Sequence, residues 1–433
     1  MNTPTSTNTQ DPHMPIIKRP HGRRLSDFGE LKEAEKILLE CCATGQEAKI
    51  GEAVPTDDAD PNTIVRAGFL RFLLLGGDED APVHERGVQL SGAWVKGDLD
   101  LENCVVPHSV TLFKCKFNGV FSLIYAHITG PLELNGSYLL KGLSADGPRC
   151  DSGVFLRDSF HSSSVVRFMK AHIGADLDCS GGQFKPREGA AFSAEGAVVK
   201  GAVYLQKPFK ATGEVRLLSA QIDGQFVCSG GQFEPKEGNA LTADGIVVKD
   251  CVYLNEEFKA TGGVSLLVAQ IGGSLVCSGG QFEPKEGNAL SADGAVVKGS
   301  VRLGNSGNKR FKATGGVRLL GAQIGGQLVC AGGQFQPKEG DALRADRADI
   351  KESVFLASQF KATGSVRLLG AVVGGDLSCS GTDRIVGVLD LGGATIKGKL
   401  LVRGVVPLCV SKLMARRLGT LRPMDHRGQR ALF

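Results

Sequence analysis

Five cysteines recur at nearly constant spacing and are the residues whose chemistry first suggests a function. They are Cys179, Cys228, Cys277, Cys330 and Cys379, separated by 49, 49, 53 and 49 residues. Aligned thiolates can bind a soft metal or carry electrons. Each cysteine, however, takes a place in an alternating pattern that Leu101 and Leu134 hold in related segments. A position shared with Leu is a packing position, so we expect a structural column of buried thiols and no metal.

Carboxylates recur in the same repeats and raise the possibility of acid–base catalysis. They are Glu188, Glu237, Glu286 and Glu339 in "KPREG", "EPKEG" and "QPKEG", and Asp244, Asp293 and Asp346 in "ADG" or "ADR". A pair of carboxylates is the machinery of glycoside hydrolysis. A catalytic pair is normally unique, whereas these acids are copied from repeat to repeat. The pattern therefore favours side chains that solvate turns.

Basic side chains form two further series, which are the candidate binding residues. Arginines take the same outward place in "VRF" and "VRLL", where Ser265 breaks the series, and lysines follow the Phe of "FKATG". These residues are Arg167, Arg216, Arg318 and Arg367, and Lys210, Lys259, Lys312 and Lys361. Stacked copies would form stripes able to dock a protein, a phosphate chain or a membrane surface. The alternative is that they keep the face soluble while neighbouring acids cancel their charge.

The elements that position these residues are short strands. Segments such as "GGQLVC", "GDLDL" and "GSLVC" alternate inward and outward residues with period two, which excludes helices there. A 49-residue repeat of short strands and glycines is typical of a solenoid. We expect an all-β, right-handed parallel β-helix over residues 83–405, with two coils per repeat. About thirteen coils at about 4.8 Å each would give a rod of roughly 60 Å, and would hold successive cysteines of the column too far apart to form a disulfide.

The two ends differ from the repeats. Residues 1–24 have the composition of a disordered leader. Residues 25–82 predict a small helical cap: a capping box at Asp27 and Glu30 starts one helix, and Asp60 with Pro61 starts another. Residues 406–433 form a basic cap or tail, in which "SKLMARRLG" predicts a short helix that closes the solenoid or attaches to a membrane or a partner.

Composition narrows the classes of function. The net charge is +4, which supports no specific nucleic-acid binding, and one Trp with four Tyr leaves few platforms for stacking sugars. No secretory or membrane-spanning apolar run is present, and the scattered remaining cysteines fit a reducing compartment. We expect a cytoplasmic protein, with peripheral membrane contact through the basic tail as a further option.

The strand-and-turn units "AHITGPLEL", "AQIGGSLVC" and "ATIKGKLLV" resemble those of the pentapeptide-repeat-like right-handed β-helix proteins of bacteria. "TIVRAGFLRFLLLGG" followed by "GVQLSGAWVKGDLDL" is similar to a group of them often labelled membrane-associated oxidoreductases. The resemblance covers about residues 60–405 and implies the fold. The oxidoreductase label implies an activity, but the matching residues are all scaffold positions, and no GxGxxG or CxxC motif accompanies them.

The sequence therefore predicts a non-enzymatic scaffold without a cofactor, which presents its Arg/Lys-striped face to a protein or anionic partner. The alternative is an enzyme, either an oxidoreductase or a carbohydrate-active β-helix, with its site in the less regular coils 102–165. Because a solenoid end exposes strand edges, a homodimer through the C-terminal coils is also expected.

Overall fold

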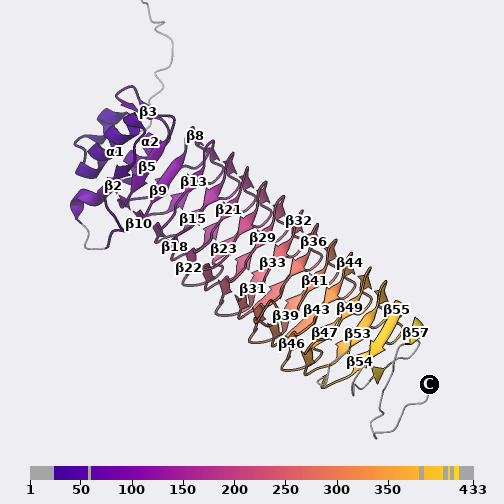
Figure 1. Ribbon diagram of the computed structural model, residues 1–433. Coiled ribbons are helices and arrows are strands. Elements are labelled where there is room, and N and C mark those ends of the chain that lie inside the picture. Colours follow the sequence, from indigo (N-terminus) through magenta and orange to yellow (C-terminus); the bar gives the residue numbers. More distant parts are fainter. Residues whose placement is uncertain (1–23, 57–59, 380–384, 403–407, 410–413, 419–433) are drawn as a thin grey trace, which may run out of the picture.

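The computed structural model describes residues 24–56, 60–379, 385–402, 408–409 and 414–418. Over this range the chain forms a right-handed parallel β-solenoid of about 13 turns with two α-helices at its N-terminal end. Figure 1 shows the coils stacked into one straight rod. The predicted fold class is confirmed.

Each coil has four short strands, one on each of four faces that run along the rod. A strand pairs in parallel with the strand of the same face in the next coil, and one residue of each two-residue strand is usually buried while the other points outward. Face 1 contains β8 (Val105–Val106), β12 (His127–Ile128), β16 (Arg149–Cys150), β20 (His172–Ile173), β24 (Val198–Val199), β28 (Gln221–Ile222), β32 (Val247–Val248), β36 (Gln270–Ile271), β40 (Val296–Val297), β44 (Gln323–Ile324), β48 (Asp349–Ile350), β52 (Val372–Val373) and the start of β55 (Thr395–Val402). Face 2 contains β1 (Ala48–Lys49), β5 (Val88–Ser91), β9 (Val110–Phe113), β13 (Leu132–Glu133), β17 (Val154–Phe155), β21 (Leu177–Asp178), β25 (Val203–Tyr204), β29 (Phe226–Val227), β33 (Val252–Tyr253), β37 (Leu275–Val276), β41 (Val301–Arg302), β45 (Leu328–Val329), β49 (Val354–Phe355), β53 (Leu377–Cys379) and the end of β55.

Faces 3 and 4 carry the lysine and arginine series. Face 3 contains β2 (Ile64–Arg66), β6 (Trp94–Lys96), β10 (Lys116–Phe117), β14 (Tyr138–Leu139), β18 (His161–Ser162), β22 (Gln183–Phe184), β26 (Lys210–Ala211), β30 (Gln232–Phe233), β34 (Lys259–Ala260), β38 (Gln281–Phe282), β42 (Lys312–Ala313), β46 (Gln334–Phe335) and β50 (Lys361–Ala362). Face 4 contains β7 (Leu99–Asp100), β11 (Phe121–Ser122), β15 (Leu143–Ser144), β19 (Val166–Arg167), β23 (Phe192–Ser193), β27 (Val215–Arg216), β31 (Asn239–Thr242), β35 (Gly263–Ser265), β39 (Asn288–Ser291), β43 (Gly316–Arg318), β47 (Leu343–Arg344), β51 (Val366–Arg367), β54 (Leu389–Asp390) and β56 (Leu408–Cys409).

The 49-residue repeat consists of one long and one short coil. Strand β20 starts at residue 172, β24 at 198 and β28 at 221, so the two coils take 26 and 23 residues. The long coil carries a loop between faces 3 and 4: eight positions separate Phe233 from Leu241, whereas four separate Ala260 from Val264 in the next short coil. Only every second coil therefore projects a loop.

The core explains why two kinds of coil alternate. Nine buried Phe rings stack along the rod with neighbouring centroids 5.0–5.5 Å apart: Phe160, Phe184, Phe209, Phe233, Phe258, Phe282, Phe311, Phe335 and Phe360. From Phe184 onward the ring of a long coil comes from the face 3 strand, as at Phe233. In a short coil it comes from the corner before that strand, as at Phe258, and the strand itself presents Ala260 beside Phe233. Each coil type thus leaves the space that its neighbour fills.

The N-terminal cap differs in detail from the predicted helices. The capping box at Asp27 is wrong for α1: Leu25–Phe28 is a 3-10 turn, and α1 (Glu33–Thr44) is capped by the Glu35 carboxylate, which accepts from the Lys32 N–H at 3.0 Å. Asp60 does cap a helix, but only the 3-10 turn Pro61–Thr63. The chain then enters β2, and α2 begins later (Ala67–Leu74), because Ile64 and Val65 are buried in face 3. β3 (Gly77–Asp78) and β4 (Ala81–Pro82) form an antiparallel pair.

Two further expectations need correction. Coils 102–165 are not less regular: β8 to β18 pair in register with their neighbours, and the register shifts that occur lie at β31, β39 and β55. In the segment expected to be a short helix, β57 (Met414–Leu418) is a strand that pairs in parallel with β55. Residues 1–23 of the expected leader and residues 406–407, 410–413 and 419–433 of the basic tail lie outside the described residues.

Candidate functional site

Four loops on the long coils project from the corner between faces 3 and 4; we call them the loop row. They are residues 186–189, 235–238, 284–287 and 337–340, each with the sequence Pro-Lys/Arg-Glu-Gly. The loops end in Gly189, Gly238, Gly287 and Gly340, whose φ values of +73 to +80° are left-handed and favour glycine. Each loop is thus a short, defined turn.

Each loop also rests on the short coil that follows it. A Cβ placed on Gly262 would lie 2.4 Å from the Gly238 carbonyl oxygen and 2.9 Å from the ring of the buried Pro235. The loop and the next coil therefore approach so closely that only glycine fits at that place in "KATG".

Lysine side chains connect successive loops. The Lys236 Nζ donates to the Arg187 carbonyl at 2.7 Å, Lys285 to the Lys236 carbonyl at 2.6 Å, and Lys338 to the Lys285 carbonyl at 2.7 Å. Each lysine thus connects two loops that lie two coils apart, about 10 Å. The ladder ties the loops into one continuous surface.

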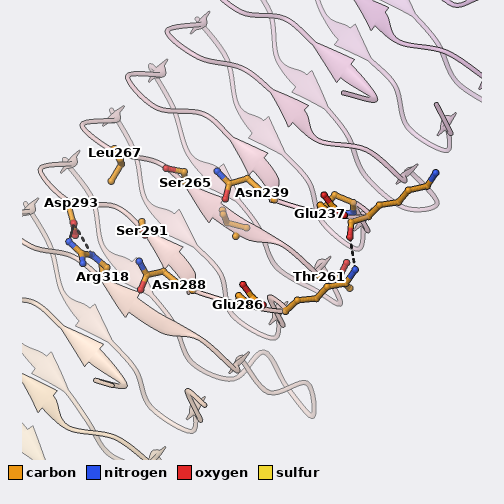
Figure 2. A pocket seen from close by; sticks show the side chains of 17 residues that line it. Glu237, Asn239, Thr261, Ser265, Leu267, Glu286, Asn288, Ser291, Asp293 and Arg318 are labelled. Atoms are coloured by element: carbon orange, nitrogen blue, oxygen red, sulfur yellow. Dashed lines mark hydrogen bonds and ion pairs between the residues drawn. The ribbon is translucent and has the colours of Figure 1, made fainter. Parts of the chain in front are cut away.

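Pockets open between successive loops. The larger, about 860 Å³, lies between the second and third loops, and another of about 650 Å³ lies between the third and fourth. Figure 2 shows Glu237 and Asn239 on one side of the larger pocket, Glu286 and Asn288 on the other, and Ser265 between them.

The floor of the larger pocket is the short coil between the loops. Gly263 and Ser265 of β35 lie where β27 of an earlier short coil has Glu214 and Arg216. The Asn239 amide lies against Gly263, and the short Ser265 side chain leaves the pocket open where Arg216 extends in the earlier coil. Arg318, which also borders the smaller pocket, closes the far end together with Asp293.

The arginine series lies half-buried on face 4, and each member faces an acid of the preceding coil. Arg216 Nε lies 3.0 Å from Glu195, Arg318 Nη2 lies 2.6 Å from Asp293, and Arg367 Nη2 lies 3.2 Å from Asp346. Arg167 pairs in the same way with Asp146. The stripe therefore carries its own counter-charges.

The lysine series on face 3 is compensated in part. Lys210 and Lys259 lie 2.7 and 3.3 Å from opposite oxygens of Glu234, whose pKa these two ammonium groups lower, and Lys312 lies 2.6 Å from Glu283. At Lys361 the acid of the preceding coil is replaced by Gln336, and no ion pair forms within the described chain.

The repeated acids divide into two groups. Glu188, Glu237, Glu286 and Glu339 are exposed on the loop row. The aspartates instead connect coils, because Asp244, Asp293 and Asp346 each accept the N–H of a Leu in the next coil at 2.9–3.1 Å. These bonds give the aspartates a structural role through one oxygen, while the loop glutamates are exposed acids available to a ligand.

The five cysteines of the column, Cys179, Cys228, Cys277, Cys330 and Cys379, are all 0 % exposed. Burial raises the pKa of the Cys179, Cys228, Cys277 and Cys330 thiols well above the ordinary value. Burial likewise raises the pKa of Cys150 to about 12. The cysteines of the column occupy the position inside the long coils that Leu205 and Leu254 occupy in the short coils.

Comparisons with protein-family models, with curated proteins and with solved structures found no match. Among the described residues, no three His, Cys, Asp or Glu side chains are grouped as a metal site. None of the helices in the described ranges is long and apolar enough to cross a membrane.

The sequence singled out the acids of the loops but not the pockets. Two sequence features mark the pockets. One is Ser265, which stands where other short coils have Arg, and the other is the four extra residues that every second coil carries after its face 3 strand. Neither feature predicts a pocket until it is known which long and short coils are neighbours on the rod.

Proposed function

We propose that the protein is a non-enzymatic scaffold that binds a protein partner along the loop row. The observation that carries this proposal is the repetition of a pocket between successive loops, built from matching residues of successive repeats. Lysine-to-carbonyl bonds hold the loops in place, so little conformational freedom is lost on binding.

The partner surface differs from the Arg/Lys stripe expected from sequence. Because the arginines of face 4 face carboxylates at 2.6–3.2 Å, a polyanion would have to compete with these ion pairs. The larger pocket has equal numbers of both signs, with Glu237, Glu286 and Asp293 against Lys236, Lys285 and Arg318. A mixed polar surface of this kind suits a protein partner better than a phosphate chain.

The experiment is affinity capture from the source cells with the parent chain and three variants of it as baits. In the first variant residues 235–238, 284–287 and 337–340 are deleted, which converts three long coils to the short form. In the second, Lys200, Lys249 and Lys298 are changed to Gln at the corner between faces 1 and 2, away from the loops. In the third, Arg216, Arg318 and Arg367 are changed to Ser.

We expect the partner to bind the parent and the Lys-to-Gln variant equally, and to be lost from the loop-deleted variant. Equal capture by the loop-deleted variant would overturn the proposal. Loss from the Arg-to-Ser variant alone would restore the stripe as the docking surface.

A further inference from the structure

The larger pocket lies where the repeat omits one of its own arginines. Outward positions of face 4 in the short coils hold Arg167, Arg216, Ser265, Arg318 and Arg367, in order along the rod. The serine leaves Arg216 and Arg318 four coils apart, about 19 Å. The pocket floor therefore includes the place from which an arginine side chain would otherwise extend.

The acid that such an arginine would meet is still present. At Arg318 the equivalent acid, Asp293, uses both oxygens: Oδ1 accepts from the Leu320 N–H at 2.9 Å, and Oδ2 accepts from the Arg318 Nε and Nη2 at 3.0 and 2.6 Å. At the serine, Asp244 Oδ1 accepts from the Leu267 N–H and from the Ser265 hydroxyl. Its Oδ2 has no donor among the described residues.

From this comparison we infer that the pocket at Ser265 binds a guanidinium group, contributed by an arginine side chain of a partner polypeptide. The guanidinium would take the position that Arg318 takes one repeat later, with Asp244 Oδ2 as its acceptor. Asp244 is not among the residues that line the pocket but is hydrogen-bonded to Ser265, which does line it. A planar guanidinium can donate from Nε and Nη2 to the one open oxygen, as Arg318 does to Asp293 Oδ2, and a single ammonium cannot match this geometry.

The walls of the pocket suit the rest of such a ligand. Glu237 and Glu286 are exposed on the two flanking loops, and Lys236 and Lys285 beside them are held by the carbonyls of neighbouring loops. Asn288, the first residue of β39 after the third loop, is exposed and offers an amide to a peptide main chain. A polypeptide can contact both walls of this open pocket, which a small cation alone cannot do.

The inference rests on the proposed docking role of the loop row but can be tested without the natural partner. The probe is the end-blocked tripeptide Gly-Arg-Gly, with Gly-citrulline-Gly as its neutral counterpart. Equilibrium dialysis at low ionic strength measures how many tripeptides bind to each full-length chain.

The repeat supplies its own matched variants. Ser265→Arg restores the residue that other short coils carry, so it should fold normally, fill the pocket and abolish binding. Arg318→Ser should open an equivalent site at Asp293 and raise the number bound from one to two. Asp244→Asn, which keeps the acceptor for Leu267, should weaken binding at least tenfold.

The parent is expected to bind one Gly-Arg-Gly and to bind the citrulline peptide at least tenfold more weakly. Equal binding by the parent and Ser265→Arg, or no binding by the parent, would overturn the guanidinium site. A parent that binds the tripeptide but captures no loop-dependent partner would leave this site standing and refute the proposed scaffold role.

Discussion

At the residue scale, the register between coils decides what each charged side chain can do. From the sequence, Arg216 and Arg318 are predicted to point outward in an uncompensated basic stripe. In the structure both lie against carboxylates one coil away. Ser265 interrupts the series and leaves Asp244 without such a counter-ion. The informative residue of the series is therefore the one that breaks it.

Val268 is the residue whose backbone conformation least suits it. It is 60 % exposed with φ of +50°, where Asn103, Gly245 and Gly294 stand at the matching turns of other coils. A β-branched residue is strained in this left-handed region, whereas Asn tolerates it. We expect Val268→Asn to raise the free energy of unfolding by about 1 kcal/mol, measured by chemical denaturation. An unchanged or lower value would show that this turn is not strained.

The thiols should differ sharply in reactivity. The five cysteines of the column are 0 % exposed, and burial raises their pKa where a shift is resolved, so few thiolates form at pH 8. Cys104 and Cys251 are partly exposed. We expect alkylation of the native protein, followed by mass spectrometry, to label these two at least tenfold faster than Cys277. Rapid labelling of the column would contradict its place in the core.

At the scale of elements, the loops are additions to a coil that is complete without them. Removing residues 235–238 leaves Phe233-Glu-Asn-Ala-Leu, the spacing that connects faces 3 and 4 in every regular short coil. We expect this deletion to lower the free energy of unfolding by only about 1 kcal/mol, with an unchanged circular dichroism spectrum. Deleting residues 259–262 instead removes β34 and should abolish cooperative unfolding. Collapse of the first variant would show that the loop is needed for the fold.

The helical cap depends on one buried ion pair. Glu35 is fully buried, and its carboxylate accepts from the Arg66 N–H, Nε and Nη2 at 2.7–2.9 Å. Burial alone raises the pKa of Glu35, but these hydrogen bonds outweigh it and hold the pKa below the usual 4.5. We expect Glu35→Gln to lower the free energy of unfolding by about 3 kcal/mol at pH 7.

The pH dependence of that difference has a defined sign. A lowered folded pKa stabilises the protein above about 4.5, and this stabilisation disappears as the pH falls through the folded value. The stabilities of the parent and Glu35→Gln should therefore converge as the pH falls from about 4.5 through the folded pKa. A difference that stays constant from pH 7 to pH 3 would show that the carboxylate charge is not responsible.

At the scale of the whole molecule, the sequence predicts the rod well because period-two alternation and a fixed repeat length leave few other folds. It predicts the cap less well, since Ile64 and Val65 fit a helix pattern and join a strand only because β6 lies beside them. It misses the pockets, because these depend on which coils become neighbours. The stack of Phe rings is similarly hidden, since its members come from two different sequence positions.

The central claim is that the loop row is the functional surface of the rod. Hydrogen–deuterium exchange of the full-length protein, with and without the captured partner, tests it most directly. We expect slower exchange in peptides covering 235–239, 260–267 and 284–288, and no change in 198–202 or 247–251. Protection confined to faces 1 and 2, with unchanged exchange in the loops, would contradict the claim.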